Sequence, residues 1–268
     1  MKHLALAALL LIPAATFAQE HAEHQMPAAP NWAKAALEKS PRHREWVKIK
    51  NGNRSVDAFV VYPQVKNKAT SVVVIHEIFG MSDWVQMEAD ELAEAGSIAI
   101  APDLLSGMGP FNDQNTIGKA IRDLPPDQIT GDLNAAADYV AKLPAANGKV
   151  AVAGFCWGGG ESFRFATNRP SLVAAFVFYG AGPESAEAIH AIKAPVYGFY
   201  AGNDARIGAT VPKTMEMMTA AKKTFEIVTY DGAGHGFMRA GDAPDASPAN
   251  KKARDEAWVR WKALLKKL

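Results

Sequence analysis

The chain of 268 residues has a single cysteine, Cys156, and therefore no partner with which to close an internal disulfide. It also has almost no net charge, with 29 Lys and Arg against 28 Asp and Glu, so it lacks the basic excess typical of nucleic-acid or anionic-membrane binding. Its main apolar run, residues 4–12, is shorter than the roughly 20 residues that a membrane-spanning helix needs. These absences disfavour three classes: disulfide-stapled proteins, nucleic-acid binders and membrane-spanning proteins.

The residues that are abundant favour a large core. Hydrophobic residues make up 49% of the chain and charged residues 21%, a balance unlike that of disordered proteins. No segment repeats at a fixed period, so a solenoid or propeller is not indicated. The composition predicts a globular protein with one large domain.

The first 18 residues have the pattern of a secretory signal peptide. Lys2 gives a positive start, residues 4–12 form the apolar segment, and Thr16 and Ala18 are small residues placed before a cleavage point. We therefore expect residues 1–18 to be removed and the mature protein to be periplasmic or secreted, with no membrane association after cleavage.

The next segment, residues 19–44, is rich in Ala, Pro, His and charges and has no sustained apolar period. It is interpreted as an N-terminal extension with a short helix at 32–39. His21 and His24 lie there without further ligands at metal-binding spacing, so no metal is expected. The main domain is expected to span residues 45–268.

Within that domain, short β-branched runs alternate with helical patterns. The first two runs alternate in polarity, as an antiparallel edge hairpin does, and most of the later ones are continuously apolar, as buried parallel strands are. The predicted fold class is an α/β three-layer sandwich with a mostly parallel central sheet. The expected strands are 46–50, 56–62, 72–76, 97–101, 150–153, 174–178, 196–201 and 224–230, and the expected helices are 83–95, 127–143, 159–168, 211–222 and 250–268.

Two segments, 107–115 and 125–126, are rich in turn-forming residues and are expected to be surface loops. They fall near the carboxyl edge of the predicted sheet. Open α/β sheets bind their ligands at that edge.

The sharpest local motif is GFCWG at 154–158, which follows an apolar strand and runs into a helical segment. This is the G-x-nucleophile-x-G pattern of a strand–turn–helix elbow, with cysteine in place of serine. A phosphate-binding loop is the competing interpretation, but no Lys-Ser or Lys-Thr follows the glycines. A buried cysteine under a glycine-rich turn is the other alternative.

Two further residues stand where a nucleophile's partners should be. Asp204 follows the predicted strand 196–201, and His235 follows the predicted strand 224–230. Taken singly they could be a turn aspartate and a loop histidine. Together with Cys156 they give the order nucleophile, acid, histidine, which nucleophilic acyl transfer on such a sheet requires.

With these motifs the chain resembles the dienelactone hydrolases of the α/β-hydrolase superfamily, from about residue 47 to the terminal helix. The resemblance rests on the following motifs: IHEIFG at 75–80, APDL at 101–104, GFCWGG at 154–159, GND at 202–204 and GHGF at 234–237. It implies a catalytic triad of Cys156, Asp204 and His235. It also implies a glutamate beside the resting thiol, Glu77, and an oxyanion hole made by the backbone amides of Ile78 and Trp157.

The resemblance further implies two arginines that bind a substrate carboxylate, and only one of them is matched. Arg239 stands at the position that follows the histidine, but the segment around Gly107 has no arginine. Cleavage of dienelactone itself is therefore not implied. Arg122 and Arg206 are candidates for the missing group, although surface charges are the simpler interpretation of both.

A cysteine with its ordinary pKa near 8.5 needs about 2.7 kcal/mol of stabilisation to be a thiolate at neutral pH. An imidazolium about 4 Å away supplies more of this than a helix N-terminus, so an ion pair with His235 is expected to dominate. Glu77 would oppose it and keep the sulfur protonated, and we hypothesise that substrate displaces Glu77. A structural strand-end carboxylate is the alternative role for Glu77.

The sequence thus predicts a cysteine-dependent carboxylic ester or lactone hydrolase that acts on a small molecule, anionic if Arg239 binds it. No cofactor or metal is required for this chemistry, and the oligomeric state is not indicated. Two alternatives stay open at this point: a hydrolase-like protein that binds a ligand without turnover, and an acyltransferase or thioesterase.

Overall fold

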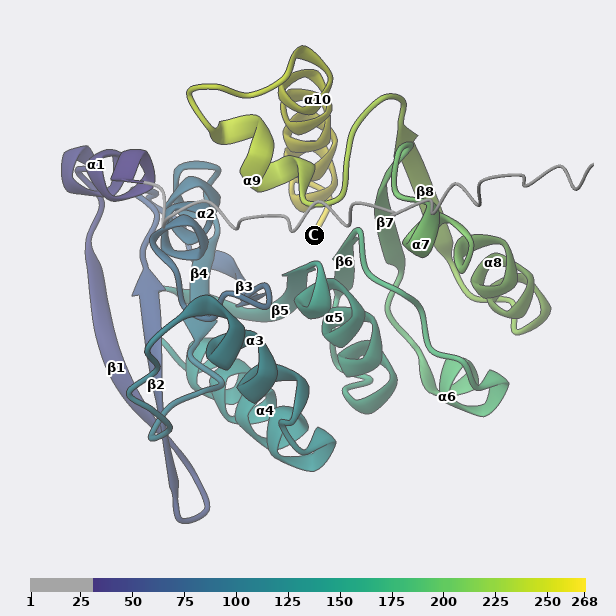
Figure 1. Cartoon of the computed structure of the whole chain (residues 1–268). Coiled ribbons are helices and arrows are strands. Elements are labelled where there is room, and N and C mark those ends of the chain that lie inside the picture. Colours follow the sequence, from purple (N-terminus) through teal and green to yellow (C-terminus); the bar gives the residue numbers. More distant parts are fainter. Residues whose placement is uncertain (1–30) are drawn as a thin grey trace, which may run out of the picture.

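The computed structural model describes residues 31–268, which form one eight-stranded sheet between two layers of helices (Figure 1). The sheet order is β1-β2-β4-β3-β5-β6-β7-β8; β1, β2 and β4 pair antiparallel, and all other neighbours are parallel. The strands are β1 (Arg44–Asn51), β2 (Arg54–Val61), β3 (Ala69–Ile75), β4 (Ile98–Pro102), β5 (Ala146–Phe155), β6 (Ala174–Phe178), β7 (Val196–Ala201) and β8 (Phe225–Tyr230).

The helices divide between the two faces of the sheet (Figure 1). One face is covered by α1 (Asn31–Lys39), α2 (Asp83–Glu94), α9 (Phe237–Asp242) and α10 (Pro248–Leu265). The other face is covered by α3 (Gln114–Arg122), α4 (Pro126–Ala141), α5 (Trp157–Asn168), α6 (Ala186–Ala191) and α8 (Val211–Ala220). A short helix, α7 (Ala205–Gly208), follows β7.

Alternation along the strands creates the two cores. In β3, Val72 and Val74 face one core while Val73 and Ile75 face the other, and all four side chains are fully buried. Strands that bury both faces are continuously apolar, which is the pattern that the sequence shows for the parallel part of the sheet.

The predicted α/β sandwich is confirmed, and the expected strands all fall on observed ones. β6 and β7 have the expected bounds, and the expected edge hairpin is β1 and β2. Four helices were not expected: α3, α6, α7 and α9. Both loop predictions are wrong at their C-terminal ends, because α3 begins at Gln114 and α4 begins at Pro126. Proline is tolerated at this first helical position, where its missing N–H has no helical partner to lose.

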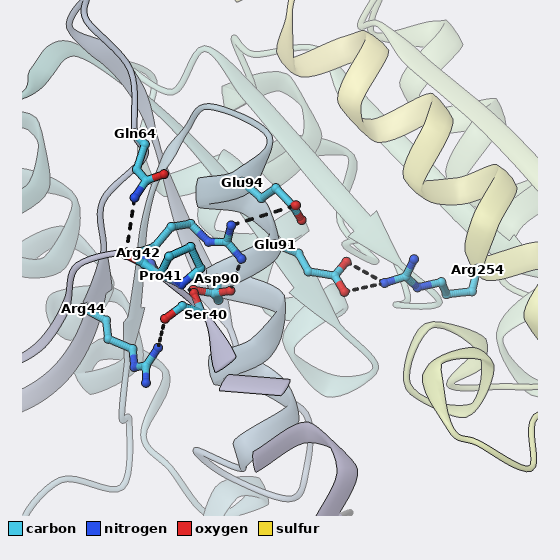
Figure 2. Close-up of polar contacts among 9 residues, drawn as sticks. All are labelled: Ser40, Pro41, Arg42, Arg44, Gln64, Asp90, Glu91, Glu94 and Arg254. Atoms are coloured by element: carbon cyan, nitrogen blue, oxygen red, sulfur yellow. Dashed lines mark hydrogen bonds and ion pairs between the residues drawn. The ribbon is translucent and has the colours of Figure 1, made fainter. Parts of the chain in front are cut away.

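The described part of the N-terminal extension packs against the domain. Helix α1 buries Ala33 and Leu37 in the core that α2 borders. The segment that follows α1 contacts α2 through Asp90 (Figure 2). The Ser40 hydroxyl donates to this carboxylate at 2.6 Å, and the Arg42 guanidinium forms an ion pair with it. Residues 31–44 therefore contribute to the fold.

The expected signal peptide, residues 1–18, lies outside the described residues, as do His21 and His24. The cleavage and export predictions stay predictions. Between residues 31 and 268, no helix has the length and apolar character needed to cross a membrane.

Candidate active site

The turn between β5 and α5 presents Cys156 in a strained backbone conformation, with φ 57° and ψ −116°. Its amide donates to the Phe178 carbonyl at 3.1 Å, which ties the turn to β6. Glycine is required on both sides: a Cβ on Gly154 would lie 1.9 Å from the Gly158 carbonyl oxygen, and one on Gly158 would lie 2.4 Å from that of His76. The sequence motif is therefore an elbow that aims one sulfur out of the sheet.

The three predicted triad residues converge at the carboxyl edge of the sheet. The His235 Nε2 atom lies 3.0 Å from the Cys156 sulfur, and its Nδ1 atom lies 2.5 Å from Asp204 Oδ2. The other oxygen of Asp204 accepts from the Ile207 amide at 3.2 Å, because Asp204 is the N-cap of α7. The carboxylate is thus fixed by the helix that it caps, and it orients the imidazole in turn.

Glu77 follows β3 and is 2% exposed. One of its oxygens accepts from Arg239 Nε at 2.8 Å, and the guanidinium of Arg239 lies 4.6 Å from the Phe79 ring centroid. The structure therefore pairs the predicted substrate arginine with the predicted glutamate. Arg239 as a substrate ligand stays a prediction.

The electrostatic surroundings of the sulfur favour a neutral thiol. Burial and the charge of Glu77 raise the pKa of Cys156 to about 11, against the smaller lowering effects of the Trp157 amide, Arg206 and Arg239. A neutral thiol donates to Nε2 of His235, whose Nδ1–H then donates to Asp204. The resting geometry matches the protonated state that the Glu77 hypothesis expects.

Glu77 is itself held between opposing effects. Burial raises the pKa of its carboxyl group, while the positive charge of Arg239 and its hydrogen bond lower it. The ion pair compensates part of the cost of burying the carboxylate. Glu77 is therefore bound to α9 through Arg239, and its charge acts on the Cys156 thiol.

A cavity of about 430 Å³ opens beside the sulfur. Ile78 and Trp157, whose amides are the predicted oxyanion hole, both line it. The indole of Trp157 also stacks on the buried His76 ring at 5.6 Å, so the side chain is both a cavity wall and part of the packing. The remaining lining residues are Arg122, Gly160, Glu161, Ala181, Arg206 and Ile207.

Three residues near the sulfur were not assigned there by sequence reasoning. Arg122 and Arg206, interpreted as surface charges, are exposed but line this cavity. Tyr179 is fully buried with φ 42°, and its ring packs edge-on against His235 at 5.1 Å. The only sequence signal for Tyr179 was its position directly after β6, at the same edge as the other site residues.

Comparison with known proteins places the chain in a family. The sequence model of the Dienelactone hydrolase family matches residues 56–268. The chain belongs to this family. A relative from Saccharolobus solfataricus, provisionally named a carboxymethylenebutenolidase, is 32% identical over 250 residues, which cover 80% of this chain and 94% of the relative. A relative from Escherichia coli with the same provisional name is 32% identical over 62% of this chain and 66% of its own length.

The solved structures agree. A crystal structure from Klebsiella pneumoniae, provisionally described as a dienelactone hydrolase, superposes with a TM-score of 0.76 at 27% identity and covers 85% of this chain and 99% of its own. A dienelactone hydrolase-like promiscuous phosphotriesterase from metagenomic libraries, P91, superposes with a TM-score of 0.73 at 23% identity, covers 85% of this chain and 98% of its own, and supports the fold alone.

Proposed function

We propose that this member of the dienelactone hydrolase family hydrolyses carboxylic esters or lactones with Cys156 as nucleophile. The observation that carries the proposal is the continuous hydrogen-bonded line from the sulfur through His235 to Asp204, at 3.0 Å and 2.5 Å. A nucleophile, a base and an orienting carboxylate in contact are the three parts that covalent acyl transfer needs.

In the first half of the reaction, His235 Nε2 takes the thiol proton and the sulfur attacks the carbonyl carbon of the substrate. The tetrahedral intermediate collapses as the carbon–oxygen bond of the ester breaks. The leaving alkoxide takes the proton from His235, and the acyl group stays on the sulfur as a thioester. In the second half, His235 removes a proton from water, which attacks the thioester and releases the acid and the thiol.

The oxyanion formed in each half would be held by the amides of Ile78 and Trp157. Both residues line the cavity beside the sulfur, and Trp157 is the first residue of α5, where backbone N–H groups are free of helical partners. Removal of one such donor from a hydrolase costs about 2.7–4 kcal/mol of transition-state stabilisation.

Glu77 keeps the enzyme inactive until a substrate arrives. Its charge is one of the two main causes of the raised pKa of Cys156, so its displacement from the sulfur would favour the thiolate. Because Glu77 is already bound to Arg239, a small movement of this pair is enough to change the field at the sulfur.

The test is turnover of a panel of neutral and anionic esters and lactones by the wild type and by Cys156→Ala. We expect at least a thousandfold loss of kcat/KM in the variant, since removal of a nucleophile leaves only the oxyanion hole and binding. Mass spectrometry of the rapidly quenched wild type should show one acyl group on the peptide that contains Cys156.

Equal rates for the wild type and Cys156→Ala would reject nucleophilic catalysis by this cysteine, whereas binding of a panel compound without turnover by either protein would favour the ligand-binding alternative. If alcohols or amines are added and an ester or amide is released in place of the acid, the acceptor of the acyl group is not water, and the acyltransferase alternative is favoured. The rates and the products are read from the same reaction mixtures.

A further inference from the structure

We propose that His76 is a positioning residue for the oxyanion hole: its Nδ1–H group holds the peptide between Glu77 and Ile78 so that the Ile78 amide points toward the substrate carbonyl. This inference rests on the proposed function and adds a residue to its machinery. His76 is the first residue after β3 and is fully buried. It does not line the cavity beside Cys156, so it acts through its neighbours.

The contact is made on the peptide unit that carries the amide. His76 Nδ1 lies 2.8 Å from the Glu77 carbonyl oxygen. The Glu77 C=O and the Ile78 N–H belong to one planar trans peptide, in which the two groups point in opposite directions. A hydrogen bond that fixes the carbonyl therefore fixes the direction of the amide as well.

The same carbonyl also closes a turn. It accepts from the Gly80 amide at 3.2 Å, with Ile78 and Phe79 at the centre of the turn. The bond from His76 is the shorter of the two and is the one made by a buried ring. Across residues 31–268 the Ile78 amide donates to no protein acceptor, so it is free to donate to an oxyanion.

The ring of His76 is held in place by Trp157, the other predicted oxyanion residue. The indole stacks on the imidazole, with ring centroids 5.6 Å apart and planes inclined by 18°. The main chain is fixed too, because the elbow packs directly on it: a Cβ on Gly158 would lie 2.4 Å from the His76 carbonyl oxygen. His76 thus contacts both parts of the predicted oxyanion hole, the peptide before Ile78 and the side chain of Trp157.

The imidazole has one polar contact to maintain. A carbonyl oxygen only accepts, so the proton of the neutral ring lies on Nδ1. Burial lowers the pKa of His76, against the smaller raising effects of its hydrogen bond to Glu77 and the charge of Asp103, and keeps the ring neutral. The Nε2 atom is buried and has no hydrogen-bond partner in the described part of the chain. A phenyl ring in the same place would therefore lose only the bond to the Glu77 carbonyl.

Two substitutions separate the donor from the ring. His76→Phe keeps a flat ring for Trp157 to stack on and removes the N–H donor. His76→Asn keeps an N–H donor bonded to Cγ, as Nδ1 is in histidine, but removes most of the ring and leaves a cavity. A purely structural role predicts the larger loss of activity for His76→Asn, whereas the positioning role predicts it for His76→Phe.

The readout compares two reactions of Cys156, the single cysteine of the chain. In the first, 4-nitrophenyl acetate acetylates the sulfur through a tetrahedral oxyanion and releases 4-nitrophenol. In the second, methyl methanethiosulfonate, which has no carbonyl group, transfers its methylthio group to the sulfur and releases methanesulfinic acid. Both reactions need the thiolate, so changes in the pKa of Cys156 cancel in the ratio of their rates, and the ratio reports the oxyanion hole.

Loss of a whole oxyanion donor lowers kcat by about 100–1,000-fold, and a donor that is only loosened should cost less. We expect the ratio of acetylation to methylthiolation to fall about thirtyfold in His76→Phe and to stay within about threefold of the wild type in His76→Asn. Ser71→Ala is the control, because it removes a buried hydroxyl from β3 away from the cavity, and its ratio should equal that of the wild type. Urea unfolding should show His76→Phe to be at least as stable as His76→Asn.

A His76→Phe ratio within about threefold of the wild type would overturn the positioning role, and so would equal losses in His76→Phe and His76→Asn. Either result leaves the proposed hydrolysis standing, provided that mass spectrometry finds the wild type acetylated at Cys156. A wild type that is methylthiolated but never acetylated would instead reject the proposed acyl transfer, and the role of His76 would fail with it.

Discussion

At the residue scale, one sulfur atom is subject to opposing charges. Glu77 raises the pKa of Cys156, Arg206 and Arg239 lower it, and burial decides the balance in favour of a thiol with a pKa of about 11. This direction matches the expectation that Glu77 keeps the sulfur protonated at rest, and the His235 ion pair is expected only for the thiolate that forms once Glu77 is displaced. A thiol that is protonated at rest resists oxidation, because the thiolate is the reactive species.

Glu77→Gln should therefore make the thiol more acidic. Removing the charge removes a main cause of the raised pKa, and it frees Arg239 to act on the sulfur unopposed. We expect the midpoint of iodoacetamide alkylation against pH to fall by about one pKa unit, which means roughly tenfold faster alkylation at pH 8. Glu161→Gln, which removes a carboxylate from the same cavity, is the control, and superimposable profiles for Glu77→Gln and the wild type would refute the gating role.

At the element scale, the elbow depends on close backbone approach. A Cβ on Gly158 would meet the carbonyl oxygens of His76 and Ile75 at 2.4 Å and 2.5 Å, whereas one on Gly160 has its nearest neighbour at 3.6 Å. Gly158→Ala should lower the free energy of unfolding by about 3 kcal/mol or more, because the main chain has to move. Gly160→Ala, two residues later in α5, should leave it unchanged or raise it by up to about 1 kcal/mol. Urea unfolding of the two variants gives the comparison, and equal losses would show that crowding of the elbow is not the cause.

The sequence predicts best those elements whose hydrophobic pattern is clear without knowledge of the rest of the fold. β6 and β7 are short apolar runs between turn residues, and their observed bounds are the expected ones. The long apolar stripe of α4 predicts a helix just as clearly, although the pattern predicts a loop at Pro126, where the helix begins. Helix α3 was missed because Gly118 interrupts its pattern, yet the Asp113 cap and its Thr116 partner carried a signal.

Helix α9 has no such local signal. It is six residues long and contains a glycine, and its position depends on contacts with distant parts of the chain. Arg239 binds Glu77 after β3, and Asp242 accepts from the Trp84 indole on α2 at 2.9 Å. The three residues of the proposed triad lie in local motifs and could be placed from the sequence. The exposed Arg122 and Arg206 lie in no such motif, so they could not be placed at the cavity before the fold was known.

At the scale of the whole molecule, a buried acidic cluster joins α2, α9 and α10. It consists of Glu88 and Glu91 from α2, Asp242 from α9 and Arg254 from α10, with Arg254 paired to both Glu91 and Asp242. Figure 2 shows the Glu91–Arg254 part of this contact. Since α9 also carries Arg239, the cluster fixes the helix on which the Glu77 pair depends.

The carboxyl groups of this cluster have raised pKa values, chiefly because they are buried. The pKa of Glu91 rises to about 7, and that of Glu88, which is fully buried beside Asp242, rises well above its usual range. A carboxyl group whose pKa is raised in the folded state stabilises the fold, and its full contribution is present below its unfolded pKa, near 4.5. This contribution is lost as the pH rises from there through the folded-state pKa. The cluster therefore makes the protein less stable at pH 8 than at pH 5.

Glu88→Gln should reduce this loss, because the amide keeps the shape of the protonated acid but has no proton to lose when the chain unfolds. The free energy of unfolding, measured in urea at pH 5, 6, 7 and 8, should fall less steeply than in the wild type, by up to about 1.4 kcal/mol per pH unit for one proton. The difference between proteins is the quantity to use, since the buried His76, whose pKa is lowered by burial, contributes with the opposite sign. Glu94→Gln, an exposed change on the same helix, should keep the wild-type slope. Equal slopes for both variants would mean that Glu88 binds the same number of protons in the folded and unfolded states over this pH range, and the pH dependence would have to come from another part of the molecule.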